Sequence, residues 1–261
     1  MPLAQWIVEK NTLGTFAFGQ SERTPPKGCN VGLWFDKFGT VAAANGNLGP
    51  SSIDWIGPLN NKTVGVDIEL AAFHTRMQAL VNAGGGTGQC LRESDWSHFV
   101  TGVGIAHPIK NGFAWHRTLG VPYLPGSGVK GMTLAWARDW AGVEGDDLMR
   151  IFGVLPDPKA VPLNAGSVIF MDAVPCAPVK LHAEILTPHG RGSGAPEEAG
   201  RPIPNGFLAV AGGTFHFAVL PRTRSVADRT DCATALAWLI AAAETIGAGA
   251  KTKTGYGRFI I

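Results

Sequence analysis

The stretch Val121-Pro122-Tyr123-Leu124-Pro125-Gly126-Ser127-Gly128-Val129-Lys130-Gly131 runs directly into a helix-like segment, which we expect over about 129–140. Its glycines allow backbone amides to approach a ligand closely, and they form the turn from a short strand into the helix. Lys130 would then lie at the start of the helix, where the helix dipole disfavours a cation. An anionic ligand at this turn would resolve that conflict, so the stretch predicts an anion-binding site.

A second segment of the same character lies near the C-terminus, from Gly247 to Phe259. Its centre reads Gly249-Ala250-Lys251-Thr252-Lys253-Thr254-Gly255-Tyr256-Gly257-Arg258. No Asp or Glu occurs from Phe99 to Arg138, and none follows Glu244. Both segments are therefore locally positive in a chain whose net charge is only +2. Flexible backbone beside fixed positive charge suits a phosphate chain.

Composition indicates a folded protein with many loops. The 261 residues are 45% hydrophobic and 16% charged, and they include 35 Gly and 18 Pro. The four cysteines are far apart and form no C-x-x-C pair, which excludes a zinc ribbon and fits a reducing cytoplasm. The sequence shows neither a secretory signal nor a membrane span, so we expect a cytoplasmic protein without a membrane partner. We expect neither a metal nor a cofactor.

The order of expected elements predicts an α+β fold. Most plausible is a ferredoxin-like (RRM-like) βαββαβ sheet with insertions and glycine-rich loops. Residues 206–211 and 214–220 read as a hairpin with Gly212-Gly213 as its turn. The other expected helices are 66–81, 147–152 and 229–246, and the other expected strands are 99–105, 112–115, 167–174, 180–186 and 256–261. The Pro/Gly-rich segment 187–205 is too long for an ordinary loop and is a candidate for a subunit contact.

Three further features of the sequence suggest other chemistry. Gly126–Gly131 matches G-x-G-x-x-G, but Pro125 precedes it and no acidic residue ends a strand about twenty residues later, as dinucleotide binding requires. His107 and His116 offer two imidazoles for metal-independent RNA cleavage. His182-Ala183-Glu184 matches the H-x-E of zinc deaminases, but the Pro-Cys-x-x-Cys that must follow is missing.

The two glycine-rich segments together resemble the signature of the RAMP superfamily of CRISPR-associated RNA-binding proteins. Residues 125–131 match its Pro-Gly-Ser-x-x-Lys-Gly turn without a gap, and residues 249–259 resemble its C-terminal glycine-rich loop. Further stretches resemble the family of the sixth Cmr protein, a backbone subunit of type III-B effector complexes. They are Gly102-Val103-Gly104-Ile105-Ala106-His107, Ile169–Pro175, Thr187-Pro188-His189 and Phe207-Leu208-Ala209-Val210. Many relatives carry a second serine or a bulkier residue where this chain has Gly128.

The resemblance implies one RAMP domain over 1–261, with its recognisable core at 99–261 and a less characteristic part at 1–98. It implies a non-catalytic crRNA-binding backbone subunit that holds the 3′ part of the guide. Its partners would be crRNA, target RNA through the guide, and other Cmr backbone subunits. Target cleavage in such complexes is attributed to a neighbouring subunit, so no catalytic residue is expected; the alternative is a metal-independent endoribonuclease that processes CRISPR RNA. The residues expected to bind RNA are Gly126, Ser127, Gly128, Lys130, Gly131, Gly249, Ala250, Lys251, Lys253, Arg258 and His107.

Overall fold

The computed structural model describes residues 24–38, 52–107, 109–153, 165–187 and 204–261. It contains a five-stranded antiparallel sheet. Its strands are β2 (Thr87–Glu93), β5 (Val168–Phe170), β6 (Val174–Pro175), β9 (Thr214–Pro221) and β10 (Phe259–Ile260). The strand order is β10-β2-β9-β5, with β6 also paired to β9. Helix α5 (Gly126–Asp139) connects β2 to β5, and α7 (Val226–Thr245) connects β9 to β10. The predicted βαββαβ order is confirmed, because these six elements give the ferredoxin-like sheet.

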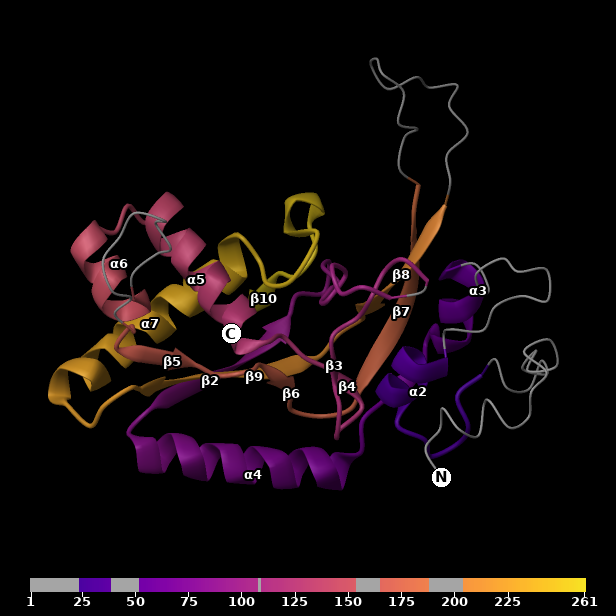
Figure 1. The fold of residues 1–261 in the computed structure, drawn as a ribbon, viewed down its shortest axis with the longest axis horizontal. Coiled ribbons are helices and arrows are strands. Elements are labelled where there is room, and N and C mark those ends of the chain that lie inside the picture. Colours follow the sequence, from indigo (N-terminus) through magenta and orange to yellow (C-terminus); the bar gives the residue numbers. More distant parts are fainter. Residues whose placement is uncertain (1–23, 39–51, 108, 154–164, 188–203) are drawn as a thin grey trace, which may run out of the picture.

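Helices cover both faces of this sheet. In Figure 1, α5 and α7 lie on one side, and α4 (Asp67–Gly84) lies on the other. The period-two alternation of β9 explains both layers. Phe215, Phe217 and Val219 belong to the main core with α7, whereas Ala218 and Leu220 pack with Val81 of α4.

A second antiparallel sheet extends beside the first, in the order β1-β7-β8. It consists of β1 (Thr63–Val64), β7 (Val179–Leu186) and β8 (Asn205–Val210), and α3 (Ser52–Ile56) packs against β8. The remaining elements are α2 (Val31–Phe38), η2 (Gly57–Leu59), β3 (Trp115–His116), β4 (Val121–Pro122), α6 (Gly145–Phe152) and η3 (Thr252–Thr254).

The structure corrects four expectations. The hairpin over 206–220 is wrong, because β8 pairs with β7 and β9 pairs with β2, so the chain passes from one sheet to the other at residues 211–213. The strand over 99–105 reduces to a single bridge between Phe99 and Val210. The terminal strand shortens to 259–260, and β2, the first strand of the ferredoxin-like unit, was not predicted at all.

Among the described residues, no helix has the length and apolar character needed to cross a membrane.

Candidate nucleic-acid interface

The first glycine-rich segment forms the entry to α5, which begins at Gly126, three residues earlier than expected. The Gly126 amide donates a 2.6 Å hydrogen bond to Asp172 Oδ1. A Cβ on Gly126 would lie 2.3 Å from the Phe170 carbonyl oxygen, so only glycine fits there. The Asp172 carboxylate therefore supplies a negative charge at this helix start, where the sequence predicts an anionic ligand.

Lys130 lies in the second turn of α5, half-buried, and not at the helix start as expected. Its side chain forms no hydrogen bond or ion pair with another residue in the described ranges. Ser127 and Gly131 are exposed on the same helix, and Gly128 is half-buried with its amide bonded to the Pro125 carbonyl at 2.7 Å. Lys130 thus carries a positive charge that no acidic side chain in the described part offsets.

The second glycine-rich segment is held in one conformation by backbone hydrogen bonds. The Ala250 amide donates to the Val100 carbonyl at 2.7 Å, and the Gly257 amide donates to the His98 carbonyl at 2.8 Å. Gly249 has a φ of +83°, and a Cβ there would lie 2.1 Å from the Val100 oxygen. We call residues 247–257 the C-terminal loop; its glycines are required by close backbone approach.

Arg258 serves the fold of the C-terminal loop. Its guanidinium donates to the carbonyls of Ile246, Thr252 and Tyr256, at 2.5, 3.3 and 3.4 Å. The contact with Ile246 satisfies a carbonyl at the end of α7, where a cation is also favoured by the helix dipole. The amide of Ala250 is likewise engaged inside the chain.

Unlike the Arg258 guanidinium, the side chains of the two lysines in the C-terminal loop are not bonded to backbone carbonyls of the described residues. Lys251 adopts a left-handed backbone conformation with φ +58°, and its Nζ lies 4.5 Å from the centroid of the Phe207 ring. Lys253 is exposed and forms neither a hydrogen bond nor an ion pair with any described residue. Two cations therefore project from a loop whose backbone is fixed.

Tyr256 anchors this loop to the second sheet. Its hydroxyl donates a hydrogen bond to Glu184 Oε2 of β7, and its ring lies edge-on to Phe207 with centroids 5.9 Å apart. Burial, together with the Glu184 carboxylate, raises the pKa of the Tyr256 hydroxyl above its usual value. This pair was not predicted from the sequence, because the two residues are 72 positions apart and meet only in the folded chain.

The two glycine-rich segments meet on either side of residues 99–101. The Val100 carbonyl accepts from Ala250 of the C-terminal loop, and the Thr101 hydroxyl donates to the Tyr123 carbonyl at 2.9 Å, just before the turn into α5. Val100, Phe207 and Ala209 also form a small buried cluster against which Tyr256 packs. Residues more than a hundred positions apart in the sequence are thus held next to a shared strand-like segment.

His107 and His116 have structural contacts. His107 Nε2 lies 3.2 Å from the Phe35 carbonyl, and its ring stacks on Phe35 with centroids 4.6 Å apart. His116 Nδ1 accepts from the Leu119 amide at 3.3 Å, and its ring meets Phe73 edge-on. Burial lowers the pKa of both imidazoles, which favours their neutral forms.

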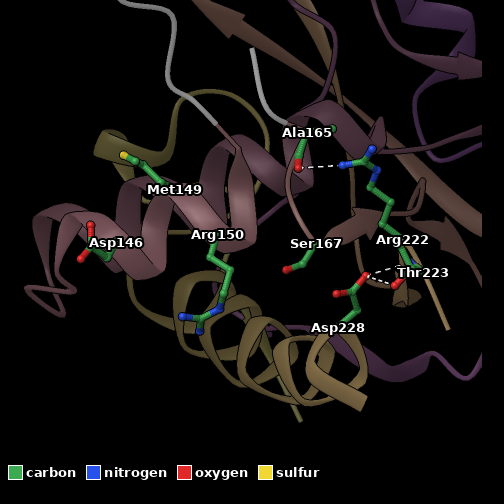
Figure 2. A pocket seen from close by; sticks show the side chains of 8 residues that line it. All are labelled: Asp146, Met149, Arg150, Ala165, Ser167, Arg222, Thr223 and Asp228. Carbon is green, nitrogen blue, oxygen red and sulfur yellow. Dashed lines mark hydrogen bonds between the residues drawn. The ribbon is translucent and has the colours of Figure 1, made fainter. Parts of the chain in front are cut away.

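A separate pocket of about 440 Å³ lies between α6, β5 and the start of α7 (Figure 2). Its two arginines are already paired, because Arg150 bonds Asp147 and Asp231 at 2.5 and 3.1 Å, and Arg222 donates to the Ala165 carbonyl at 2.9 Å. Figure 2 shows Arg150 directed toward α7 and away from Arg222. With Asp146 and Asp228 also in its lining, this pocket is a poorer match for phosphate than the C-terminal loop.

The expected subunit contact at 187–205, including His189, lies almost wholly outside the described residues.

Comparison with one solved structure supports the fold. A chain in the cryo-EM structure of the type III-B Cmr-beta bound to cognate target RNA is similar at 18% identity, with a TM-score of 0.56 and coverage of 75% of this chain. The present chain spans 66% of the length of that neighbour. Cmr6 from Pyrococcus furiosus is 24% identical over 67% of this chain and 98% of its own, with a TM-score of 0.39. No curated protein matches the chain.

The model of the RAMP superfamily matches residues 84–260, which begin just before β2 and end in β10. The match therefore spans all six elements of the βαββαβ unit, both glycine-rich segments and the anchor between Tyr256 and Glu184. On this evidence the chain belongs to the RAMP superfamily.

Proposed function

We propose that this chain is a non-catalytic RNA-binding subunit of a type III-B CRISPR effector complex, in which it holds the 3′ part of the guide RNA as a backbone subunit. Its partners would be the guide, target RNA paired to that guide, and neighbouring backbone subunits. It would work in the cytoplasm. Membership of the RAMP superfamily and the motif resemblance to the family of the sixth Cmr protein support this role.

One observation carries the proposal: residues 99–101 hold the two glycine-rich segments together, and the segments present three lysines (Lys130, Lys251 and Lys253) unpaired with any acid in the described structure. Lys130, Lys251 and Lys253 would neutralise phosphates along the RNA backbone. Tyr256, which is half-buried, supplies an aromatic ring near Lys251, whereas Phe207 is buried beneath the Lys251 ammonium. Contacts of this kind position RNA without reading its sequence, which suits a protein whose target specificity comes from guide pairing.

The absence of a catalytic role is part of the proposal. General acid–base cleavage needs imidazoles that can reach the scissile phosphate. His107 and His116 instead use ring nitrogens in hydrogen bonds to the chain itself, and both lie against aromatic side chains. These contacts favour a structural role for the two histidines over the endoribonuclease alternative.

The test is affinity purification of the tagged full chain from its own host at moderate salt, with an untagged strain as the control. We expect short RNAs of defined length to accompany the chain together with several other proteins. Recovery of the chain without RNA or partner proteins would contradict the proposal. Cleavage of added RNA in EDTA that is lost on His107→Ala or His116→Ala would establish the endoribonuclease instead.

A further inference from the structure

Two histidines and a carboxylate converge beneath the C-terminal loop. They form a cluster separate from the lysines proposed to bind RNA. They are His98, which follows β2, and His182 and Glu184 of β7. One nitrogen or oxygen atom from each residue can be chosen so that all three atoms lie within 4.8 Å of one another. Neutral imidazole and carboxylate are preferred ligands of Zn²⁺ and of other divalent transition metals.

The fold fixes each of these side chains. His182 and Glu184 are two positions apart on a strand, so both project from the same face of β7. His98 is held beside them because its neighbour Phe99 exchanges two backbone hydrogen bonds with Val210, at 3.1 and 2.7 Å. The rings of His98 and His182 have centroids 4.8 Å apart.

The carboxylate is placed between two partners. Glu184 Oε1 lies 2.8 Å from His98 Nδ1, and Glu184 Oε2 accepts from the Tyr256 hydroxyl. Donor atoms around a tetrahedral Zn²⁺ lie about 3.3–3.6 Å apart, given bond lengths of about 2.0–2.2 Å. Small side-chain rotations would therefore open the His98–Glu184 hydrogen bond and admit an ion, while Tyr256 continued to orient the carboxylate.

The site is reachable and its charge is suitable. The side chains of His98 and Glu184 are 35% and 18% exposed, and His98 also lines a surface cavity of about 380 Å³ that includes Asp95. Two neutral imidazoles and one carboxylate carry a charge of −1, which offsets part of a divalent cation. Lys251 of the C-terminal loop is directed over the Phe207 ring.

We propose that His98, His182 and Glu184 bind one Zn²⁺ ion per chain, with the fourth position open to water or another oxygen ligand. Because Glu184 also holds Tyr256, the ion would fasten the C-terminal loop to β7. This inference does not depend on RNA binding.

The test uses the full chain, stripped with EDTA and dialysed, and isothermal titration with Zn²⁺ alone. We expect a stoichiometry near one and a rise in the melting temperature with Zn²⁺. The variants His182→Ala and Glu184→Gln should each weaken binding by at least about tenfold. Visible absorption of bound Co²⁺, a spectroscopic substitute for Zn²⁺, should disappear in the same variants.

The matched control is His74→Ala. His74 and His216 form another pair of neighbouring imidazoles, with ring centroids 5.7 Å apart, on the face of the sheet covered by α4. His74→Ala should leave Zn²⁺ affinity unchanged. Equal Zn²⁺ binding by the wild type and Glu184→Gln, or no stoichiometric binding by the wild type, would overturn the proposal. Circular dichroism verifies folding, and Glu184→Gln, which preserves side-chain shape, carries the test if His182→Ala does not fold.

Discussion

Asp172 caps α5 from a distance in the sequence: its Oδ1 accepts a 2.6 Å hydrogen bond from the amide of Gly126. Gly126 is the first residue of the helix, so the carboxylate satisfies an amide that has no partner within the helix. The same carboxylate lies where the helix dipole favours negative charge. The Pro-Gly-Ser turn is thus completed by the segment that follows β5.

Removing this hydrogen bond should destabilise the protein. We expect Asp172→Ala to lower the free energy of unfolding by about 1–2 kcal/mol, because the Gly126 amide loses a charged acceptor. Urea unfolding followed by circular dichroism measures the change. The control is Asp139→Ala, at the exposed far end of α5, where the carboxylate pairs with Arg138 on the surface. Equal losses in the two variants would show that Asp172 does not cap the helix.

Local sequence chemistry predicted the glycine turn into α5, helix α7 and the strands β5, β9 and β10, because these depend on turn residues and apolar spacing near in sequence. It did not predict β2. That strand, Thr87-Gly88-Gln89-Cys90-Leu91-Arg92-Glu93, lacks apolar alternation, and its buried positions near the C-terminal end are Leu91 and Glu93. A buried acid and a strand glycine oppose strand propensity, so only tertiary pairing with β9 and β10 fixes this segment.

In the candidate site, too, some features follow from the local sequence and others depend on tertiary contacts. The local sequence and the family resemblance predict RNA contacts at Lys251 and Lys253, but they did not predict the Gly126–Asp172 and His98–Glu184 contacts. Their partners are 46 and 86 positions apart. They become neighbours only through the sheet pairings, which the mistaken hairpin over 206–220 had assigned differently. Sequence spacing cannot specify such contacts until strand partners are known.

RNA retention should depend on the lysines of the C-terminal loop. We expect the double variant Lys251→Ala/Lys253→Ala to reduce the magnitude of the log–log salt slope of RNA binding by about 0.7 for each phosphate that is no longer neutralised. Filter binding of a short single-stranded RNA over a range of salt concentrations measures the slope. Arg76→Ala, an exposed cation on α4 across the sheet, is the control and should leave it unchanged. A slope unaltered in the double variant would remove both lysines from the interface.

Glu93 should make stability depend on pH. The residue is 1% exposed, and burial raises the pKa of its carboxyl from 4.5 to about 8. Its Oε1 accepts from the Phe99 amide at 2.9 Å, whereas Oε2 has no hydrogen-bond partner among the described residues. Because the folded state favours the protonated acid, the stabilisation is complete below pH 4.5 and is lost as pH rises to about 8.

The matched variant is Glu93→Gln, which stays neutral. Between pH 4.5 and 8, the unfolding free energy of the wild type should fall relative to that of the variant by at most about 5 kcal/mol. Denaturant unfolding at several pH values measures it, and the histidines common to both proteins cancel in the difference. A constant difference across this range would show that Glu93 ionises normally in the fold.

Arg258 has two candidate roles, stabilising the fold and binding phosphate, and the variant Arg258→Ala separates them. Its guanidinium donates to the carbonyls of Ile246, Thr252 and Tyr256, so Arg258→Ala leaves acceptors at the end of α7 and in the C-terminal loop without their donor. We expect a loss of about 1–3 kcal/mol in unfolding free energy, measured by urea denaturation. Lys253→Ala, an exposed neighbour, should cost little stability. The salt slope of RNA binding by folded Arg258→Ala then decides its second role: an unchanged slope confines Arg258 to the fold, and a smaller one adds the phosphate interaction expected from the sequence.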